Sequence, residues 1–298
     1  MGSPEFAVPA LQKLAEHYTV VGVVTQPDRP AGRGRTLTPP PVKQAADSLG
    51  IATIQPVRLK DADVLDQLQA WQPDLILVVA YGKILRAAVL ELPSYGSVNV
   101  HASLLPRWRG AAPIQAALYH GDSHTGVTIM KMGEGLDTGP ILSQRKVEIL
   151  AEDTGESLSA RLAQVGAELL LETLSGYLQG SILPQAQDDS QATYAPQLKK
   201  EDGLLDFDRP AEALARQVRA YFPWPGTFSY WQGEILKVHK AHAAPGSSDE
   251  PGQRQIVEGK PALGTRQGWL VLDEVQPAGK RSMSGKEFLS GARNWAVG

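Results

Sequence analysis

The sequence Val98-Asn-Val-His-Ala-Ser-Leu-Leu-Pro106 carries the clearest information about the fold of this chain. It begins as the end of a short buried strand, and alternation along that strand places Asn99 and His101 on one face. Asp137 lies between two glycines, shortly after a second apolar run at residues 127–130. The carboxyl ends of parallel strands open on a common crevice. The spacing therefore predicts a site that joins an amide, an imidazole and a carboxylate.

These three groups suit a reaction in which an oxyanion forms on carbon. An amide donates a hydrogen bond to the oxyanion, and a carboxylate sets the charge of a titratable imidazole. Simpler interpretations exist, because an asparagine near a strand end is usually a cap or turn residue and an isolated histidine is usually a satisfied group. Spacing alone leaves both interpretations open.

Apolar segments alternate with helical periodicity over the first two thirds of the chain. Buried strands are expected at residues 20–24, 75–80, 98–101 and 127–130, and helices at residues 4–16, 42–49, 61–69, 113–119 and 154–178. Asp153 or Thr154 is expected to cap the last helix. The alternation predicts an α/β fold, with a doubly wound, mostly parallel sheet that has helices on both faces.

The composition changes after residue 184. Residues 185–200 are polar and are predicted to form a linker. A helix is expected to start near Pro210, and short strands follow at residues 227–231, 235–241, 255–257 and 269–275. Glycines and prolines separate these strands, a pattern that predicts a small β-barrel. The expected domains are therefore residues 1–184 and 201–298.

Composition excludes several classes of protein and site. The 298 residues suffice for two domains. No apolar run approaches a membrane span and no signal peptide is visible, so no membrane contact is expected. The absence of cysteine excludes disulfides and thiolate nucleophiles, and the six histidines lack the paired spacing of a metal site. With a net charge of −3, any contact with nucleic acid must be local.

A basic segment offers such a contact. Residues 27–41 are rich in proline and glycine and carry Arg29, Arg33 and Arg35, and Lys43 follows them. The segment is either a solvated connection or a loop that becomes ordered on nucleic acid, where arginines meet phosphates or base edges.

Two further stretches bear on the chemistry. Arg107-Trp-Arg109 is either a packed turn or a pair of arginines that meet phosphates. The Gly-x-Gly-x-x-Gly turn of dinucleotide-binding domains is absent, because Gly32-Arg-Gly34 lies in a proline-rich loop. This absence argues against a nicotinamide enzyme, although the fold class alone does not decide the chemistry.

The stretch Asn99-Val-His-Ala-Ser-Leu-Leu-Pro-Arg-Trp-Arg-Gly-Ala-Ala-Pro-Ile-Gln115 resembles the signature of the 10-formyltetrahydrofolate-dependent formyltransferases. Residues 107–115 resemble in particular the members that act on methionyl-tRNA, as do residues 25–34, 79–82 and 276–280. The resemblance implies a Rossmann-like catalytic domain followed by an OB-like, tRNA-binding domain. It also implies 10-formyltetrahydrofolate as formyl donor, methionyl initiator tRNA as acceptor, no metal, and a cytoplasmic monomer.

The matched positions imply a role for each site residue. The catalytic residues would be Asn99, His101 and Asp137. The folate would bind against Tyr81, Gly82, Ile84, Leu85, Ser103, Leu104, Leu105 and Pro106. The tRNA would contact Arg29, Arg33, Arg35 and Lys43.

The family normally has a strand before the turn that is here Gly2-Ser-Pro4, so the first strand of the sheet is expected to be missing.

The sequence leaves two alternatives to this function. One is a formyltransferase that acts on a small nucleotide-linked amine, and the arginine-rich loop and the second domain count against it. The other is a nucleic-acid-binding protein without catalysis, and the presence of Asn99, His101 and Asp137 counts against it.

Overall fold

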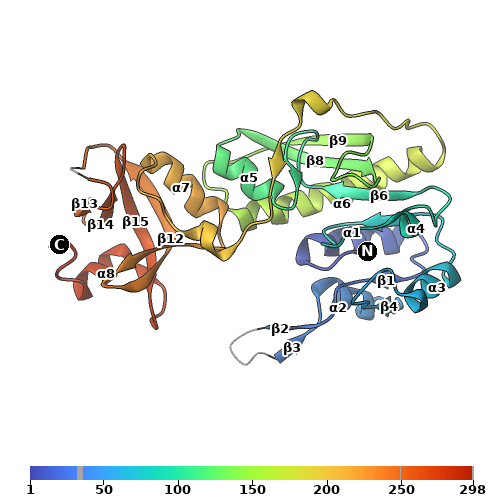
Figure 1. Cartoon of the computed structure of the whole chain (residues 1–298), viewed down its shortest axis with the longest axis horizontal. Helices are drawn as coiled ribbons and strands as arrows, with labels where there is room; N and C mark the ends of the chain where they lie inside the picture. Colours follow the sequence, from blue (N-terminus) through green and yellow to red (C-terminus); the bar gives the residue numbers. More distant parts are fainter. Residues whose placement is uncertain (32–35, 249, 297–298) are drawn as a thin grey trace. The chain divides into compact units, whose positions relative to one another are not determined.

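The computed structural model describes residues 1–31, 36–248 and 250–296, and the chain divides into two compact units (Figure 1). The first unit comprises Met1–Pro113, His124–Glu148 and Ser159–Ala195. The second comprises Ile114–Ser123, Ile149–Leu158 and Pro196–Gly298. Each unit therefore draws on segments that are distant in the sequence.

The main sheet of the first unit is mixed. Its order is β5 (Ile76–Val78), β6 (Ser97–His101), β8 (His124–Lys131) and β9 (Ile141–Glu148). β5 and β6 are parallel, whereas β8 is antiparallel to both β6 and β9. The prediction of a mostly parallel sheet is therefore wrong for the strand at residues 127–130.

The elements around β8 explain this difference. The chain leaves β6 in the first unit, contributes α5 (Pro113–His120) almost entirely to the second unit, and returns to the first unit as β8, which pairs antiparallel with β6. β9 was not predicted, because its sequence contains no long apolar run. From Ser143 to Glu148 its side chains alternate between half-buried and exposed, so this part of the strand needs few apolar residues.

The helices of the first unit largely follow the predicted ranges. They are the 3-10 turn η1 (Glu5–Ala7), α1 (Val8–His17), α2 (Pro41–Ser48), α3 (Ala62–Ala70) and most of α6 (Gly155–Leu178). The short helix α4 (Ala87–Leu90) was not predicted. Thr154 caps α6, since its Oγ1 accepts the N–H of Ser157 at 3.2 Å. Within the described residues, no helix has both the length and the apolar character needed to cross a membrane.

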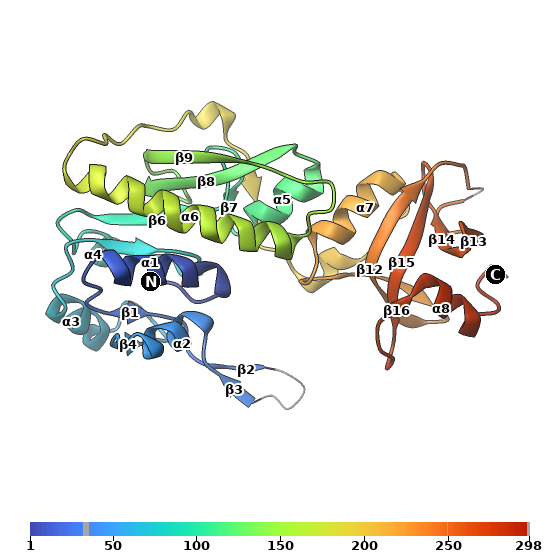
Figure 2. The same ribbon diagram turned by 180° about the vertical axis from the view of Figure 1, so that it is seen from behind.

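α6 covers one face of the main sheet (Figure 2). Gly166 of this helix lies so close to the sheet that a Cβ atom there would be 3.0 Å from Val100 and 3.5 Å from Val127. Val100 therefore faces α6. Because side chains alternate along a strand, Asn99 and His101 lie on the opposite face of β6.

A parallel pair, β1 (Val23–Val24) and β4 (Thr53–Ile54), lies beside this sheet in the same unit. Apolar residues of β1, β5, α3 and α4 form a common core, which includes Val24, Leu68, Ile76, Val78 and Val89. A short antiparallel hairpin, β2 (Arg29–Ala31) with β3 (Thr36–Thr38), follows β1 where the sequence predicted an irregular loop.

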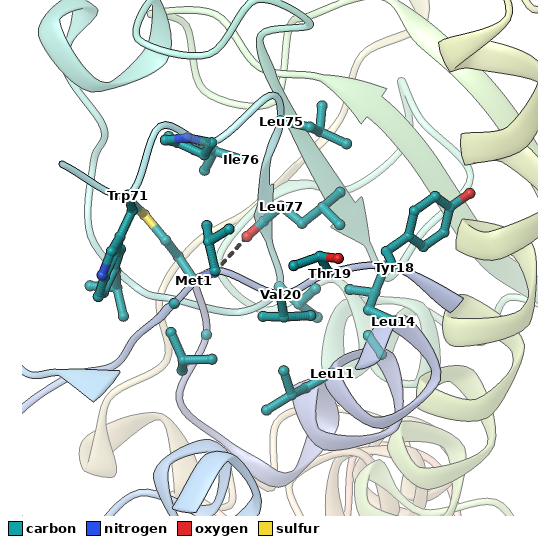
Figure 3. Close-up of a pocket in the computed structure, with 18 of the residues that line it drawn as sticks. Met1, Leu11, Leu14, Tyr18, Thr19, Val20, Trp71, Leu75, Ile76 and Leu77 are labelled. Carbon is teal, nitrogen blue, oxygen red and sulfur yellow. Dashed lines mark hydrogen bonds between the residues drawn. The ribbon is translucent and has the colours of Figure 1, made fainter. Parts of the chain in front are cut away.

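Met1 and Gly2 lie between β1 and β5. The Met1 amine donates to Leu77 O at 2.6 Å, and the Gly2 N–H donates to Val24 O at 3.1 Å. An apolar cavity of about 410 Å³ lies beside Met1, between α1 and these strands (Figure 3). Its lining includes Leu11, Leu14, Val20, Trp71 and Leu75. The expectation that a first strand is missing stays a prediction.

The polar segment at residues 185–200, predicted as a linker, is bonded to the first unit. It contains the 3-10 turn η2 (Asp189–Gln191) and the strand β10 (Tyr194–Ala195), which pairs in parallel with β7 (Arg109–Gly110). The 3-10 turn η3 (Lys200–Gly203) follows. Most of the segment is therefore part of the first unit.

The second unit contains an antiparallel sheet. Its order is β11 (Thr227–Trp231), β12 (Glu234–Ala244), β15 (Trp269–Pro277), β14 (Lys260–Gly264) and β13 (Arg254–Val257), with β16 (Met283–Ser284) paired to β15. The helices α7 (Ala211–Ala220) and α8 (Gly285–Gly291) contribute to a core with Trp231, Phe288 and Trp295. Among the described strands, no pairing of β11 with β13 closes the sheet, so the predicted barrel is not confirmed.

One polar cluster bridges three strands of this second sheet. His242 Nδ1 lies 2.8 Å from Asp273 Oδ2, and His242 Nε2 lies 3.0 Å from Glu258 Oε2. Lys260 donates to the other Asp273 oxygen at 2.6 Å. The hydrogen bond to Asp273, followed by that to Glu258, raises the pKa of His242 above its ordinary value despite partial burial.

Candidate active site

His101 is held in one orientation at the end of β6. Its Nε2 lies 2.9 Å from the carbonyl oxygen of Trp108, which can only accept, so Nε2 carries a proton. Its Nδ1 lies 3.6 Å from Asp137 Oδ2. This distance is longer than a hydrogen bond but short enough for strong attraction between charges. The ring is buried, and Nδ1 is the nitrogen left for acid–base chemistry.

Asp137 reaches His101 through a loop that turns back from the end of β8. Because β8 is antiparallel to β6, its end at Lys131 pairs with Val98 and not with His101. Asp137 has a φ of 50°, and its Oδ2 accepts the N–H of Gly110 at 2.8 Å. The predicted proximity of imidazole and carboxylate is therefore present, but the common edge of parallel strands is not its cause.

Asn99 shares the face of β6 that carries His101. Its side chain is half-buried, and its amide has no hydrogen-bond partner among the described residues. It is a free donor beside the imidazole. The three candidate catalytic residues thus combine a free amide, an oriented imidazole and an anchored carboxylate.

A buried arginine and a glutamine brace the Asp137 loop, and sequence analysis missed the glutamine. Gln187 Nε2 donates to the carbonyl oxygens of Asp137 at 2.8 Å and Gly139 at 2.7 Å. Arg109 is only 2% exposed and donates to Gln187 Oε1 through Nη2 at 2.8 Å and to Asp189 at 2.6 Å. Arg109 is therefore a packed internal residue. Gln187 gave no signal, since it lies in a polar stretch without periodicity.

The segment proposed to face the folate follows β5. Tyr81 is buried, and its carbonyl accepts from Gln26 Nε2 at 2.9 Å, which joins this segment to the loop after β1. Burial raises the pKa of the Tyr81 hydroxyl to about 12. Leu85 belongs to the core, whereas Gly82 is exposed and Ile84 is 85% exposed. Backbone groups and the Ile84 side chain are therefore what this segment offers to a ligand.

The turn after His101 is held mainly through its backbone. Ser103 Oγ donates to Arg107 O at 2.6 Å, and Thr128 Oγ1 donates to Ser103 O at 2.6 Å. The Leu105 N–H donates to Thr128 Oγ1 at 3.1 Å. Ser103 and Leu105 are buried, whereas Leu104 and Pro106 are partly accessible.

The residues proposed to contact tRNA are only partly described. Arg29 is exposed at the base of the β2–β3 hairpin and donates to Gln26 Oε1. Lys43 lies on α2 and forms an ion pair with Asp47 at 2.9 Å. Arg33 and Arg35 lie outside the described residues. In the ranges that the structure describes, no group of three or more histidines and acidic residues could hold a metal ion.

Comparison with known proteins identifies close relatives. The chain matches the family model for formyl transferase at residues 3–174 and that for the formyl transferase C-terminal domain at residues 197–293. A methionyl-tRNA formyltransferase of Myxococcus xanthus is 47% identical over 98% of this chain and 93% of its own length. One of Chloroflexus aggregans is 48% identical over 98% of this chain and 96% of its own.

A solved structure has the same fold. The N-formyltransferase from Helicobacter canadensis, in complex with folinic acid and dTDP-3-aminofucose, is similar with a TM-score of 0.67 at 16% identity. The match covers 93% of this chain and 97% of that one.

Proposed function

The chain belongs to the formyl transferase family, and we propose that it transfers the formyl group of 10-formyltetrahydrofolate to the α-amine of methionyl initiator tRNA. The relatives that share nearly half of its sequence over almost its full length are named for formylation of methionyl-tRNA. The observation that carries the chemistry is the pair of His101 Nδ1 and Asp137 Oδ2, 3.6 Å apart, beside the free amide of Asn99.

The reaction needs an oxyanion site and a proton acceptor. The amine attacks the formyl carbon, a C–N bond forms, and the carbonyl electrons move to oxygen. Asn99 donates a hydrogen bond to that oxygen, and the protonated Nδ1 of His101 is the second donor. Asp137 stabilises the imidazolium and receives the proton of the attacking amine, directly or through water.

The intermediate then collapses towards products. The bond between the formyl carbon and N10 of the folate breaks, and N10 takes up a proton as tetrahydrofolate leaves. Because Gly110 already donates to Asp137 Oδ2, the Oδ1 atom is the one available for proton transfer. No step requires a metal.

We propose that the pterin lies against the backbone of Tyr81 and Gly82 and the side chain of Ile84, with Leu85 beneath it. A flat heterocycle needs backbone donors and acceptors together with an apolar face, and the exposure of Ile84 fits this requirement. Ser103, Leu104, Leu105 and Pro106 would border the same site from the turn after β6.

We propose that tRNA contacts Arg29, Arg33, Arg35 and Lys43 together with the second domain, residues 201–298, as an OB-like module. Residues 1–184 would form the catalytic domain of a cytoplasmic monomer. Basic side chains are suited to phosphate contacts on an otherwise acidic protein.

The test is a formyl-transfer assay on the purified chain with 10-formyltetrahydrofolate and charged tRNAs. We expect formylmethionine to appear on initiator tRNA and much more slowly on charged elongator tRNA. A nucleotide-linked amino sugar serves as the competing acceptor. Faster formylation of that sugar, or no transfer to initiator tRNA, would refute the proposal.

A further inference from the structure

We propose that Gln187 and Thr193, in the segment 187–195, position two of the three candidate catalytic side chains: Gln187 holds the loop of Asp137, and Thr193 holds the peptide whose carbonyl binds His101. This inference rests on the proposed function. The segment lies outside both family matches, which end at residue 174 and resume at residue 197. Its roles come from contacts alone, and neither residue touches the reacting atoms.

The first set of contacts, made by Gln187, fixes the loop that carries Asp137. Gln187 is half-buried within a run of exposed residues, and its amide nitrogen donates to both Asp137 O and Gly139 O. Its amide oxygen accepts two bonds from Arg109, through Nε at 3.1 Å and Nη2 at 2.8 Å. All the hydrogen-bonding capacity of the amide is therefore directed at fixing the loop to a buried arginine.

The Asp137 loop needs such a brace. Residues 133–136 are exposed, and Asp137 has a positive φ, a conformation that is unfavourable for a residue with a Cβ. A loop of this kind relaxes unless its surroundings determine its shape. Displacement of a catalytic group by about 1 Å can lower a rate by about 100-fold.

The second set of contacts, made by Thr193, orients His101 through the backbone of Trp108. The Trp108 N–H donates to Thr193 Oγ1 at 2.9 Å, and the Trp108 carbonyl is the group that binds His101 Nε2 at 2.9 Å. On either side of Trp108, the Thr193 N–H donates to Pro106 O at 3.3 Å and the Arg109 N–H donates to Thr193 O at 2.8 Å. Thr193 therefore fixes the peptide that orients the imidazole.

The decisive variant is Gln187→Glu, in the full chain. A carboxylate has the size of the amide and still accepts from Arg109, but it has no N–H to donate to Asp137 O and Gly139 O. We expect kcat to fall about 10- to 100-fold while both KM values change by less than about twofold. Gln191→Glu is the matched control, because Gln191 lies in the same segment and its side chain, among the residues that the structure describes, bonds only to exposed Asp188.

Two further measurements separate positioning from general destabilisation. In an Asp137→Asn background, Gln187→Glu should lower kcat by no more than about twofold, because both changes act through the same carboxylate. Thr193→Val should lower kcat, and Thr193→Ser, which keeps the hydroxyl, should restore it. An equal loss from Gln187→Glu in both backgrounds would overturn the inference.

The NMR resonances of the His101 ring test the positioning role independently of formyl transfer. In the free protein, Gln187→Glu should move the ring resonances of His101 in the same direction as Asp137→Asn, and Gln191→Glu should leave them in place. Unmoved resonances would refute the positioning role whether or not the chain formylates tRNA. An inactive wild-type chain would refute the proposed function alone.

Discussion

Asp137→Asn tests the electrostatic core of the mechanism. The asparagine oxygen can still accept the N–H of Gly110, so the loop should keep its shape while the charge is lost. Asp137 Oδ2 lies 3.6 Å from His101 Nδ1, and two unit charges about 4 Å apart attract by about 4 kcal/mol at an effective dielectric constant near 20.

The size of the effect follows from this attraction. The Asp137 side chain is 17% exposed, so water lowers the interaction with an imidazolium, to about 3–4 kcal/mol. Since about 1.4 kcal/mol corresponds to a factor of ten in rate, kcat should fall about 10²- to 10³-fold.

The assay is single-turnover formylation of methionyl initiator tRNA, with thermal unfolding measured in parallel. Glu134→Gln is the matched control, because Glu134 lies in the same loop, is exposed and should be replaceable without loss of rate. A folded Asp137→Asn variant with a rate within about threefold of wild type, a difference below about 1 kcal/mol, would refute the electrostatic coupling.

Three other outcomes are expected. Asn99→Ala should lower kcat about 10²- to 10³-fold with little change in KM, as measured by steady-state formylation, because one oxyanion donor is removed. Joint replacement of Arg29, Arg33 and Arg35 by alanine should weaken tRNA binding and flatten its salt dependence in filter binding, while folate binding stays unchanged. The raised pKa of His242 means that its ion pairs stabilise the folded state most at pH below the ordinary histidine pKa. This contribution is lost as pH rises through the raised pKa, so His242→Gln should flatten the pH dependence of urea unfolding across that range.

Most helices and the strand β6 could be predicted from the sequence because their signals are local. α6 combines a long amphipathic pattern with a threonine cap, and β6 ends at His101 as expected. Two strands gave weak signals in the sequence. β14 is short and begins next to a turn, and β9 alternates exposed and half-buried residues. The direction of β8 carried no local signal, since it is set by the pairing of β8 with β6 and β9, which are distant in the sequence.

The candidate site was predictable in its residues but not in the contacts that assemble it. The prediction that Asp137 approaches His101 relied on parallel strands, and the structure reaches the same proximity with an antiparallel β8 and a returning loop. That loop is held by Gln187, which lies 50 residues further along the chain and has no periodic pattern. Chemistry constrains the identity of a catalytic side chain, whereas many polar residues at many positions could brace it. The groups that hold the site are therefore identified from the structure and not from the sequence. Gln187 is the example: it lies in a polar stretch typical of exposed loops, yet its side chain fixes the loop that carries Asp137.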